Sequence, residues 1–206
     1  MPTLFFVRHG ESEANVKLEY AGHLSVPLTA KGEFEAEHTS ANFSKTNDIS
    51  KIYCSPLLRA QQTAGFFAKK FNLPIEINDL IQEQDMGDYS GKAYAFTEKL
   101  PSFEPNVGKR WNWAPDNGET YAQVARRACQ FLAFVQVRPA DEKILVVTHG
   151  VFLRLMRGAL ENTLPTYYTG LTRNCEIYKT NFTKLNQRHT IESIYFGEPD
   201  NKIHRE

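Results

Sequence analysis

The chain has 206 residues, and its 24 lysine and arginine residues balance 24 aspartate and glutamate residues. An apolar content of 41% and a charged content of 23% are typical of a soluble globular protein with one compact domain. The zero net charge argues against a nucleic-acid-binding protein, which normally carries a strongly basic face. No stretch approaches ~18 consecutive apolar residues, so we expect no membrane-spanning helix.

The three cysteines, Cys54, Cys129 and Cys175, lie far apart and form no Cys-x-x-Cys pair. This spacing is typical neither of a disulfide framework nor of a zinc site, and it fits a reducing compartment. Residues 1–6 lack the basic and apolar pattern of a signal peptide. We therefore expect a cytoplasmic protein.

Short apolar runs alternate with helical patterns along the chain. The TLFFV run at residues 3–7 is typical of a central strand buried on both faces. Thr29 predicts the N-cap of a helix that continues to residue 43. Ser55 followed by Pro56 predicts the start of another helix, which ends near residue 71. Further strands are predicted at residues 49–54, 75–77, 143–148, 176–180 and 190–196, and further helices at 120–137 and 151–160.

This alternation predicts an α/β fold, a three-layer sandwich with a mostly parallel central sheet and helices on both faces. We expect residues 1–206 to form a single domain. Residues 87–118 hold three prolines and both tryptophans, a composition that favours a lid rather than core. Ligands of such sheets bind outside the carboxyl ends of the strands. Because Arg8-His9 and His149 directly follow predicted strands, we expect them to meet at this edge.

The side chains expected at this edge suit the transfer of a phosphoryl group. A neutral imidazole can attack phosphorus and form a phosphohistidine. The planar fork of an arginine can hold the non-bridging oxygens through paired, charge-assisted hydrogen bonds. For these tasks the chain offers Arg8, His9, Arg59 and His149.

A phosphoryl transfer also needs an acid that protonates the leaving oxygen. Glu83 lies in the turn-rich segment IQEQDMGDYSG and could be partly desolvated under the predicted lid. Asp85 and Glu11 are alternative candidates for this acid, because they carry the same carboxyl group.

Six sequence blocks resemble one known family in their order and spacing. They are RHGES with Asn15 (residues 8–15), PLTAKG (27–32), CSPLLRAQQTA (54–64), EQDMGDYSG (83–91), NGET (117–120) and VVTHGVFLR (146–154). A single RHG triplet would be weak support, whereas the ordered set is specific. The chain resembles the histidine phosphatase superfamily, in its phosphoglycerate-mutase-like branch (branch 1).

The resemblance implies a role for each site residue. His9 would be the nucleophile that becomes phosphorylated, and Arg8, Arg59 and His149 would line the phosphate pocket. Glu83 would donate the proton and later activate water. Ser12 and Asn15 would be auxiliary phosphate contacts, and Gly150 would allow close approach of the backbone. The family needs no metal, and we expect no cofactor.

Hydrolysis of phosphomonoesters is the function that the sequence favours, with a small phosphorylated substrate. A cofactor-dependent phosphoglycerate mutase is the first alternative, but the interval between Gly91 and Thr120 is short and lacks an obvious paired-arginine site. Mutases of the family also tend to have tryptophan where this chain has Ala14. A non-catalytic protein that binds phosphorylated ligands would be expected to have a defective catalytic set. A homodimer remains open.

Three residues of the predicted lid, Arg110, Trp111 and Trp113, fit two interpretations equally well. They could contact the substrate, or they could form an aromatic cover packed on the edge of the sheet. The Arg126-Arg127 pair is predicted to lie on a solvated helix face.

Overall fold

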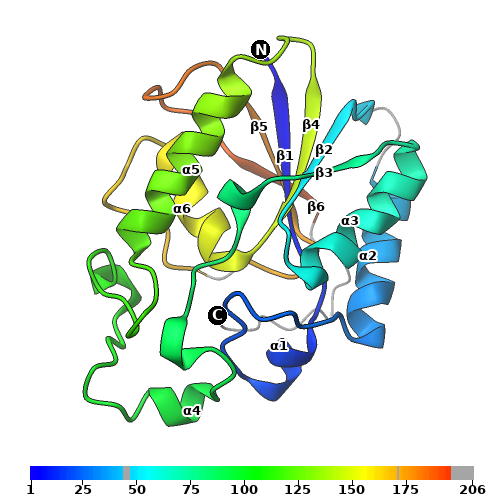
Figure 1. Ribbon diagram of the computed structural model, residues 1–206. Coiled ribbons are helices and arrows are strands. Elements are labelled where there is room, and N and C mark those ends of the chain that lie inside the picture. Colours follow the sequence, from blue (N-terminus) through cyan, green and yellow to red (C-terminus); the bar gives the residue numbers. More distant parts are fainter. Residues whose placement is uncertain (44–46, 171, 196–206) are drawn as a thin grey trace.

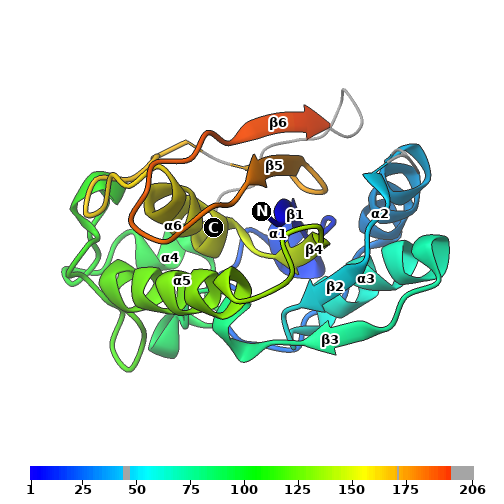
Figure 2. The ribbon, with the colours of Figure 1, turned by 90° about the horizontal axis from the view of Figure 1, so that it is seen from above.

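The computed structural model describes residues 1–43, 47–170 and 172–195. A six-stranded sheet forms the middle layer, with helices on both of its faces (Figures 1 and 2). The strands are β1 (Thr3–Arg8), β2 (Lys51–Cys54), β3 (Ile75–Ile77), β4 (Lys143–Thr148), β5 (Ile177–Asn181) and β6 (Glu192–Tyr195). The helices are α1 (Glu13–Lys17), α2 (Ala30–Asn42), α3 (Leu58–Phe71), α4 (Tyr94–Thr97), α5 (Tyr121–Gln136) and α6 (Gly150–Leu160). The predicted α/β class is confirmed.

The strand order is β3-β2-β4-β1-β5-β6. The first four of these strands are parallel, β5 runs antiparallel to β1, and β6 runs antiparallel to β5. The pairing of β1 with β4 runs from Thr3 opposite Lys143 to Arg8 opposite Thr148. The residues that follow, His9 and His149, therefore leave the sheet side by side.

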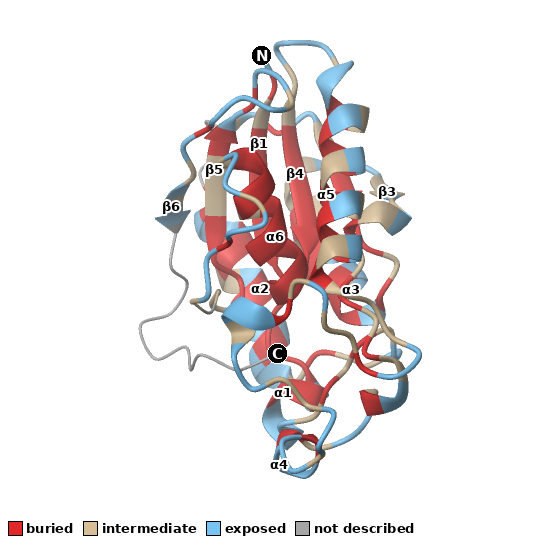
Figure 3. Cartoon of the chain, turned by 90° about the vertical axis from the view of Figure 1, so that its left-hand side faces the viewer, coloured by how far each residue is buried: buried red, intermediate tan, exposed pale blue. Residues whose placement is uncertain are grey.

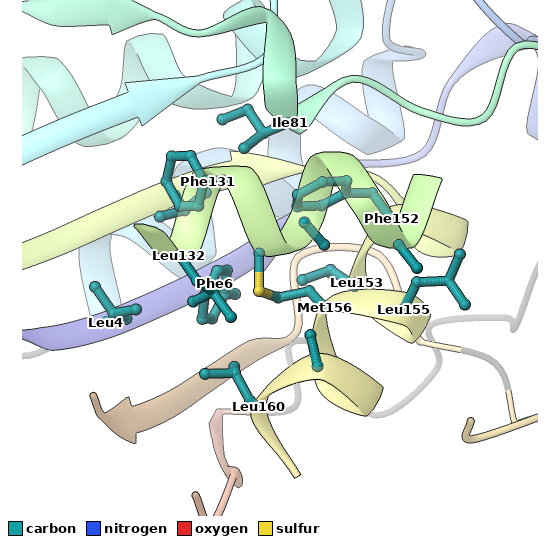
Figure 4. Packing of buried hydrophobic residues seen from close by; sticks show 14 of the residues in the cluster. Leu4, Phe6, Ile81, Phe131, Leu132, Phe152, Leu153, Leu155, Met156 and Leu160 are labelled. Carbon is teal, nitrogen blue, oxygen red and sulfur yellow. The ribbon is translucent and has the colours of Figure 1, made fainter. Parts of the chain in front are cut away.

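Two apolar cores cover the two faces of the sheet. Because side chains alternate along a strand, Leu4 and Phe6 of β1 belong to the core beneath α5 and α6, and Phe5 and Val7 belong to the core beneath α3. Figure 3 shows β1 and β4 buried along almost their whole length, and Figure 4 shows the packing around Phe6. The central strands are thus fixed from both sides, which gives the loops after them a rigid base.

The local predictions differ from the structure at several termini. Thr29 caps α2 as expected, because its hydroxyl accepts the Gly32 N–H. Helix α3, however, begins at Leu58, so Leu57 and not Ser55 is its N-cap residue, and it has no side-chain cap. Helix α1 was not predicted, since it has five residues and depends on a capping box at its start. Of the predicted strand at 190–196, residue 196 lies outside the described residues.

Residues 87–118 contain α4 and two short 3₁₀ turns, and their aromatic side chains pack in a small cluster together with Tyr20 and Met86. The Arg110 guanidinium lies over the rings of Phe103 and Trp113, at 5.0 and 5.2 Å from their centres. The Trp113 indole donates to the Ser102 carbonyl, and Trp111 stacks against Tyr167. These contacts favour the aromatic-cover interpretation of Arg110, Trp111 and Trp113.

Candidate active site

His9 lies at the end of β1, with a fully buried ring. Its Nδ1 is 2.7 Å from the Gly10 carbonyl oxygen, which can only accept, so Nδ1 carries the proton. Nε2 is then an acceptor, and the Arg59 Nε–H donates to it at 3.3 Å. Nε2 thus holds the lone pair that could attack an anionic phosphate once a phosphate oxygen takes over the hydrogen bond from Arg59.

His149 lies next to His9, with the ring centres 5.2 Å apart. It immediately precedes α6 and is also fully buried. Its Nε2 is 2.8 Å from the Ser55 hydroxyl, which in turn accepts the Leu57 N–H. Ser55 thus connects the second imidazole to the backbone just before α3.

Two buried arginines supply positive charge at this end of the sheet. Arg59, in the first turn of α3, donates to the carbonyls of Gly22 at 2.9 Å and Leu24 at 3.3 Å. Arg8, the last residue of β1, donates to the Thr172 carbonyl at 2.6 Å. Both side chains are only 1% exposed, and buried guanidinium groups favour an anionic ligand.

Glu83 faces the same site from the segment after β3. Its carboxylate accepts three backbone N–H groups, from Gln84 at 2.9 Å, Val151 at 3.2 Å and Phe152 at 3.1 Å. The last two belong to the first turn of α6, where N–H groups have no partner within the helix. The start of α6 therefore orients the Glu83 carboxylate through the N–H groups of the second and third residues after His149.

The two competing carboxylates lie elsewhere. Glu11 binds the Thr29 hydroxyl at 2.9 Å and the Lys31 ammonium at 3.1 Å, both at the start of α2. Asp85 is partly exposed and accepts the Gly87 N–H at 2.9 Å. Among the three candidate acids, Glu83 is the one that lines the pocket described next.

A small pocket of about 20 Å³ opens beside these residues. It is lined by Asn15, Glu19, Tyr20, Ala21, Gly22, Arg59, Glu83, Gln84, Met86, Tyr94 and Val151. Asn15 Oδ1 accepts two hydrogen bonds from Ser12, which leaves its amide group as a donor for an anion. Ser12 caps α1 and does not line the pocket, whereas Gly150 is buried at the start of α6.

Further residues hold the site together although nothing in the sequence singled them out. The Asn174 amide donates to the His9 carbonyl at 2.8 Å. The Glu35 carboxylate, in α2, accepts the Glu11 N–H at 2.8 Å. Both contacts join segments that are distant in the chain, so a local pattern could not have indicated them.

Within the part of the chain that the structure describes, no group of three or more His, Cys, Asp or Glu residues could hold a metal ion. A helix with the length and apolarity needed to cross a membrane is likewise absent from residues 1–43, 47–170 and 172–195.

Comparison with known proteins gives a family for this geometry. The model of the histidine phosphatase superfamily (branch 1) matches residues 4–192. Phosphoserine phosphatase 1 of Hydrogenobacter thermophilus is 34% identical over 165 residues, covering 78% of this chain and 76% of the relative. A 2,3-bisphosphoglycerate-dependent phosphoglycerate mutase of Bartonella bacilliformis is 32% identical over 170 residues, covering 77% and 81%.

A solved structure of a mycobacterial glucosyl-3-phosphoglycerate phosphatase shares the fold, with a TM-score of 0.82 and 23% identity over 93% of this chain and 97% of that chain. The chain belongs to the histidine phosphatase superfamily, branch 1. It is an enzyme of the histidine phosphatase type, which hydrolyses phosphomonoesters.

Close packing of the His9 loop on α2 gives a first prediction. A Cβ atom at Gly32 would lie 2.0 Å from the Glu11 carbonyl oxygen, so Gly32→Ala must displace the loop that carries His9. We expect this variant to lose stability and most phosphatase activity. Gly65→Ala is the matched control, because a Cβ there meets nothing within 4 Å. In the middle of α3 it should raise the free energy of unfolding by about 0.5–1 kcal/mol. Equal behaviour of the two variants in denaturant titrations would contradict the packing argument.

The buried carboxyl of Glu35 gives a second prediction, on pH. Burial raises the pKa of Glu35, and the Glu11 N–H and Lys31 only partly offset this effect. Between the ordinary glutamate pKa and the raised one, the folded state binds more protons than the unfolded state, so stability falls as pH rises. Glu35→Gln removes this titration and keeps an acceptor for the Glu11 N–H. Its free energy of unfolding, relative to the wild type, should therefore increase from pH ~4 upwards. Parallel stability curves for the two proteins would contradict the prediction.

Proposed function

We propose that the reaction proceeds through a phosphohistidine on His9. His9 Nε2 attacks the substrate phosphorus in line with the leaving oxygen, and the bond between phosphorus and that oxygen breaks. A water molecule then attacks the phosphohistidine, the P–N bond breaks, and inorganic phosphate leaves. The observation that carries this proposal is the Nε2 lone pair of His9 held 3.3 Å from the Arg59 guanidinium.

The positive groups around His9 would stabilise the transferred phosphoryl group. Arg8, Arg59 and His149 would bind its non-bridging oxygens, with the Asn15 amide as a further donor. Their burial supports this role, because hydrogen bonds to charge are strong where water is excluded. Gly150 would let the backbone at the start of α6 approach the phosphate.

Glu83 would carry the proton in both steps. In the first step Glu83 would act in its protonated form, as a general acid. It then donates this proton to the leaving oxygen, and in the second step it accepts one from the attacking water. Its place in the pocket wall supports this assignment over Glu11 and Asp85.

Hydrolysis fits the pocket better than mutase chemistry. A mutase has to hold a second phosphate, which requires further cations. Among the described residues that line the pocket, Arg59 is the one cation, and Glu19 adds a carboxylate. Tyr20, Met86 and Tyr94 add an aromatic and apolar part to the wall, which suits a small phosphorylated substrate with a largely apolar leaving group.

We also propose a cytoplasmic location. Cys54, Cys129 and Cys175 are all free thiols, and burial raises the pKa of each of them. Such thiols are unreactive and are compatible with a reducing compartment.

Hydrolysis of p-nitrophenyl phosphate in excess EDTA tests the proposed mechanism. The wild type should release phosphate, and His9→Ala should show no turnover because no phosphohistidine can form. Arg59→Ala should lower kcat about 10²–10³-fold, the effect of removing one preorganised donor to transition-state charge. Arg126→Ala, on the exposed side of α5, is the control and should match the wild type.

Release that survives His9→Ala would contradict the mechanism. Activity that depends on 2,3-bisphosphoglycerate, with the phosphate retained in the product, would instead establish the mutase alternative.

A further inference from the structure

We propose that Arg127 and Glu119 are positioning residues that hold the Glu83 segment in place for proton transfer. This inference rests on the proposed function, in which Glu83 is the proton donor. Neither residue lines the pocket, so both would act through Glu83.

The Arg127 guanidinium binds the backbone of the segment that leads to Glu83. Nη1 donates to the carbonyls of Leu80 and Gln82, both at 2.9 Å, and Nη2 donates to the Glu83 carbonyl at 3.1 Å. Arg127 lies on α5, so these bonds connect a long, rigid helix to an irregular segment. The prediction of a solvated helix face was therefore wrong for Arg127, whose side chain is 17% exposed, and correct for Arg126.

Glu119 completes the connection on the far side of Glu83. Its carboxylate accepts Arg127 Nε at 3.0 Å and Nη2 at 2.7 Å, and it also accepts the Asp85 N–H at 3.0 Å. The Glu119 carbonyl accepts the Gln84 side-chain amide at 2.7 Å. The backbone is thus bound on both sides of the residue whose carboxylate has to reach the leaving oxygen.

Arginine suits this position because it has five N–H donors in a fixed plane. The five hydrogen bonds from Arg127, three to backbone carbonyls and two to Glu119, use this full set. A lysine has a single charged nitrogen and cannot reproduce the fork. Arg127 also lies over the Phe152 ring, whose backbone N–H binds the Glu83 carboxylate.

The ion pair between the two side chains persists at moderately acidic pH. Burial by itself would raise the pKa of Glu119, but the hydrogen bonds and charge of Arg127 outweigh it, and the pKa is lowered. Arg127 therefore favours the charged form of the Glu119 carboxyl, which keeps the positioning contact an ion pair.

Other contacts keep the segment folded when Arg127 is changed. Ile81 is fully buried in the core beneath α5 and α6 and lies beside α5 (Figure 4), and its carbonyl accepts the Thr148 hydroxyl at 2.7 Å. Substitution of Arg127 should thus loosen the backbone around Glu83 without removing the segment from the core. A loss of activity in such a variant would therefore report the position of Glu83 and not unfolding of the protein.

The test compares leaving groups in Arg127→Lys, with Arg126→Lys as the matched control. We would measure kcat/KM for p-nitrophenyl phosphate, whose leaving group needs little protonation, and for phenyl and alkyl phosphates, which need an acid. The value of kcat/KM depends only on the steps up to formation of the phosphoenzyme. It is therefore not affected by hydrolysis of the phosphoenzyme in the second step. Arg127→Lys should change kcat/KM for p-nitrophenyl phosphate less than about 3-fold. For alkyl phosphates the loss should approach the ~10²-fold or more that a general acid contributes.

Glu83→Gln provides the reference, and it should show the same dependence on the leaving group. In the double variant with Arg127→Lys, the leaving-group effect should be no larger than in Glu83→Gln alone. The two changes remove the same function, protonation of the leaving group, so their effects should not add. If Arg127→Lys does not fold, Glu119→Gln carries the same test, because it removes the charge and retains an oxygen acceptor.

Equal losses for all leaving groups in Arg127→Lys, with the expected behaviour of Glu83→Gln, would overturn the positioning role and leave the proposed function intact. Activity equal to that of Arg126→Lys would do the same. If Glu83→Gln itself showed no dependence on the leaving group, the assignment of Glu83 would fail, and the proposal would fail with it.

Discussion

The parallel pairing of β1 with β4 determines where the reactive groups of this molecule lie. Its register sets Arg8 opposite Thr148, so His9 and His149 leave the sheet together with their ring centres 5.2 Å apart. Apolar cores on both faces of the sheet hold the two strands. The reacting imidazole thus follows a strand that is buried on both faces, which suits a reaction that depends on in-line geometry.

The second constraint is the burial of charge. Guanidinium groups are costly to bury without hydrogen bonds, and here backbone carbonyls are directed at them from the loops around Gly22 and Thr172. The carboxylate of Glu83 is satisfied in the same way by the N–H groups at the start of α6. The loops therefore contribute to the electrostatics of the site, because their carbonyl groups bind the buried charged side chains and hold them in place.

The sequence predicted the parts of this account that are local. The RHG and THG motifs directly follow apolar runs, so the meeting of His9 and His149 could be inferred from strand ends alone. Contacts between distant segments could not. Arg127 has the spacing of an exposed helical residue, and only its bonds to the Glu83 segment distinguish it from Arg126. Ser55 carried the signal of a helix cap, but tertiary packing directs its hydroxyl to His149.

The central claim is that His9 becomes phosphorylated, and the most direct measurement is to trap that intermediate. Glu83→Gln should slow attack by water while a good leaving group still departs, so the phosphoenzyme should accumulate with p-nitrophenyl phosphate. Alkaline quenching followed by peptide mass spectrometry should then place one phosphoryl group on His9. A phosphoryl group on another residue, or a pre-steady-state burst of product without any phosphorylated protein, would contradict the account.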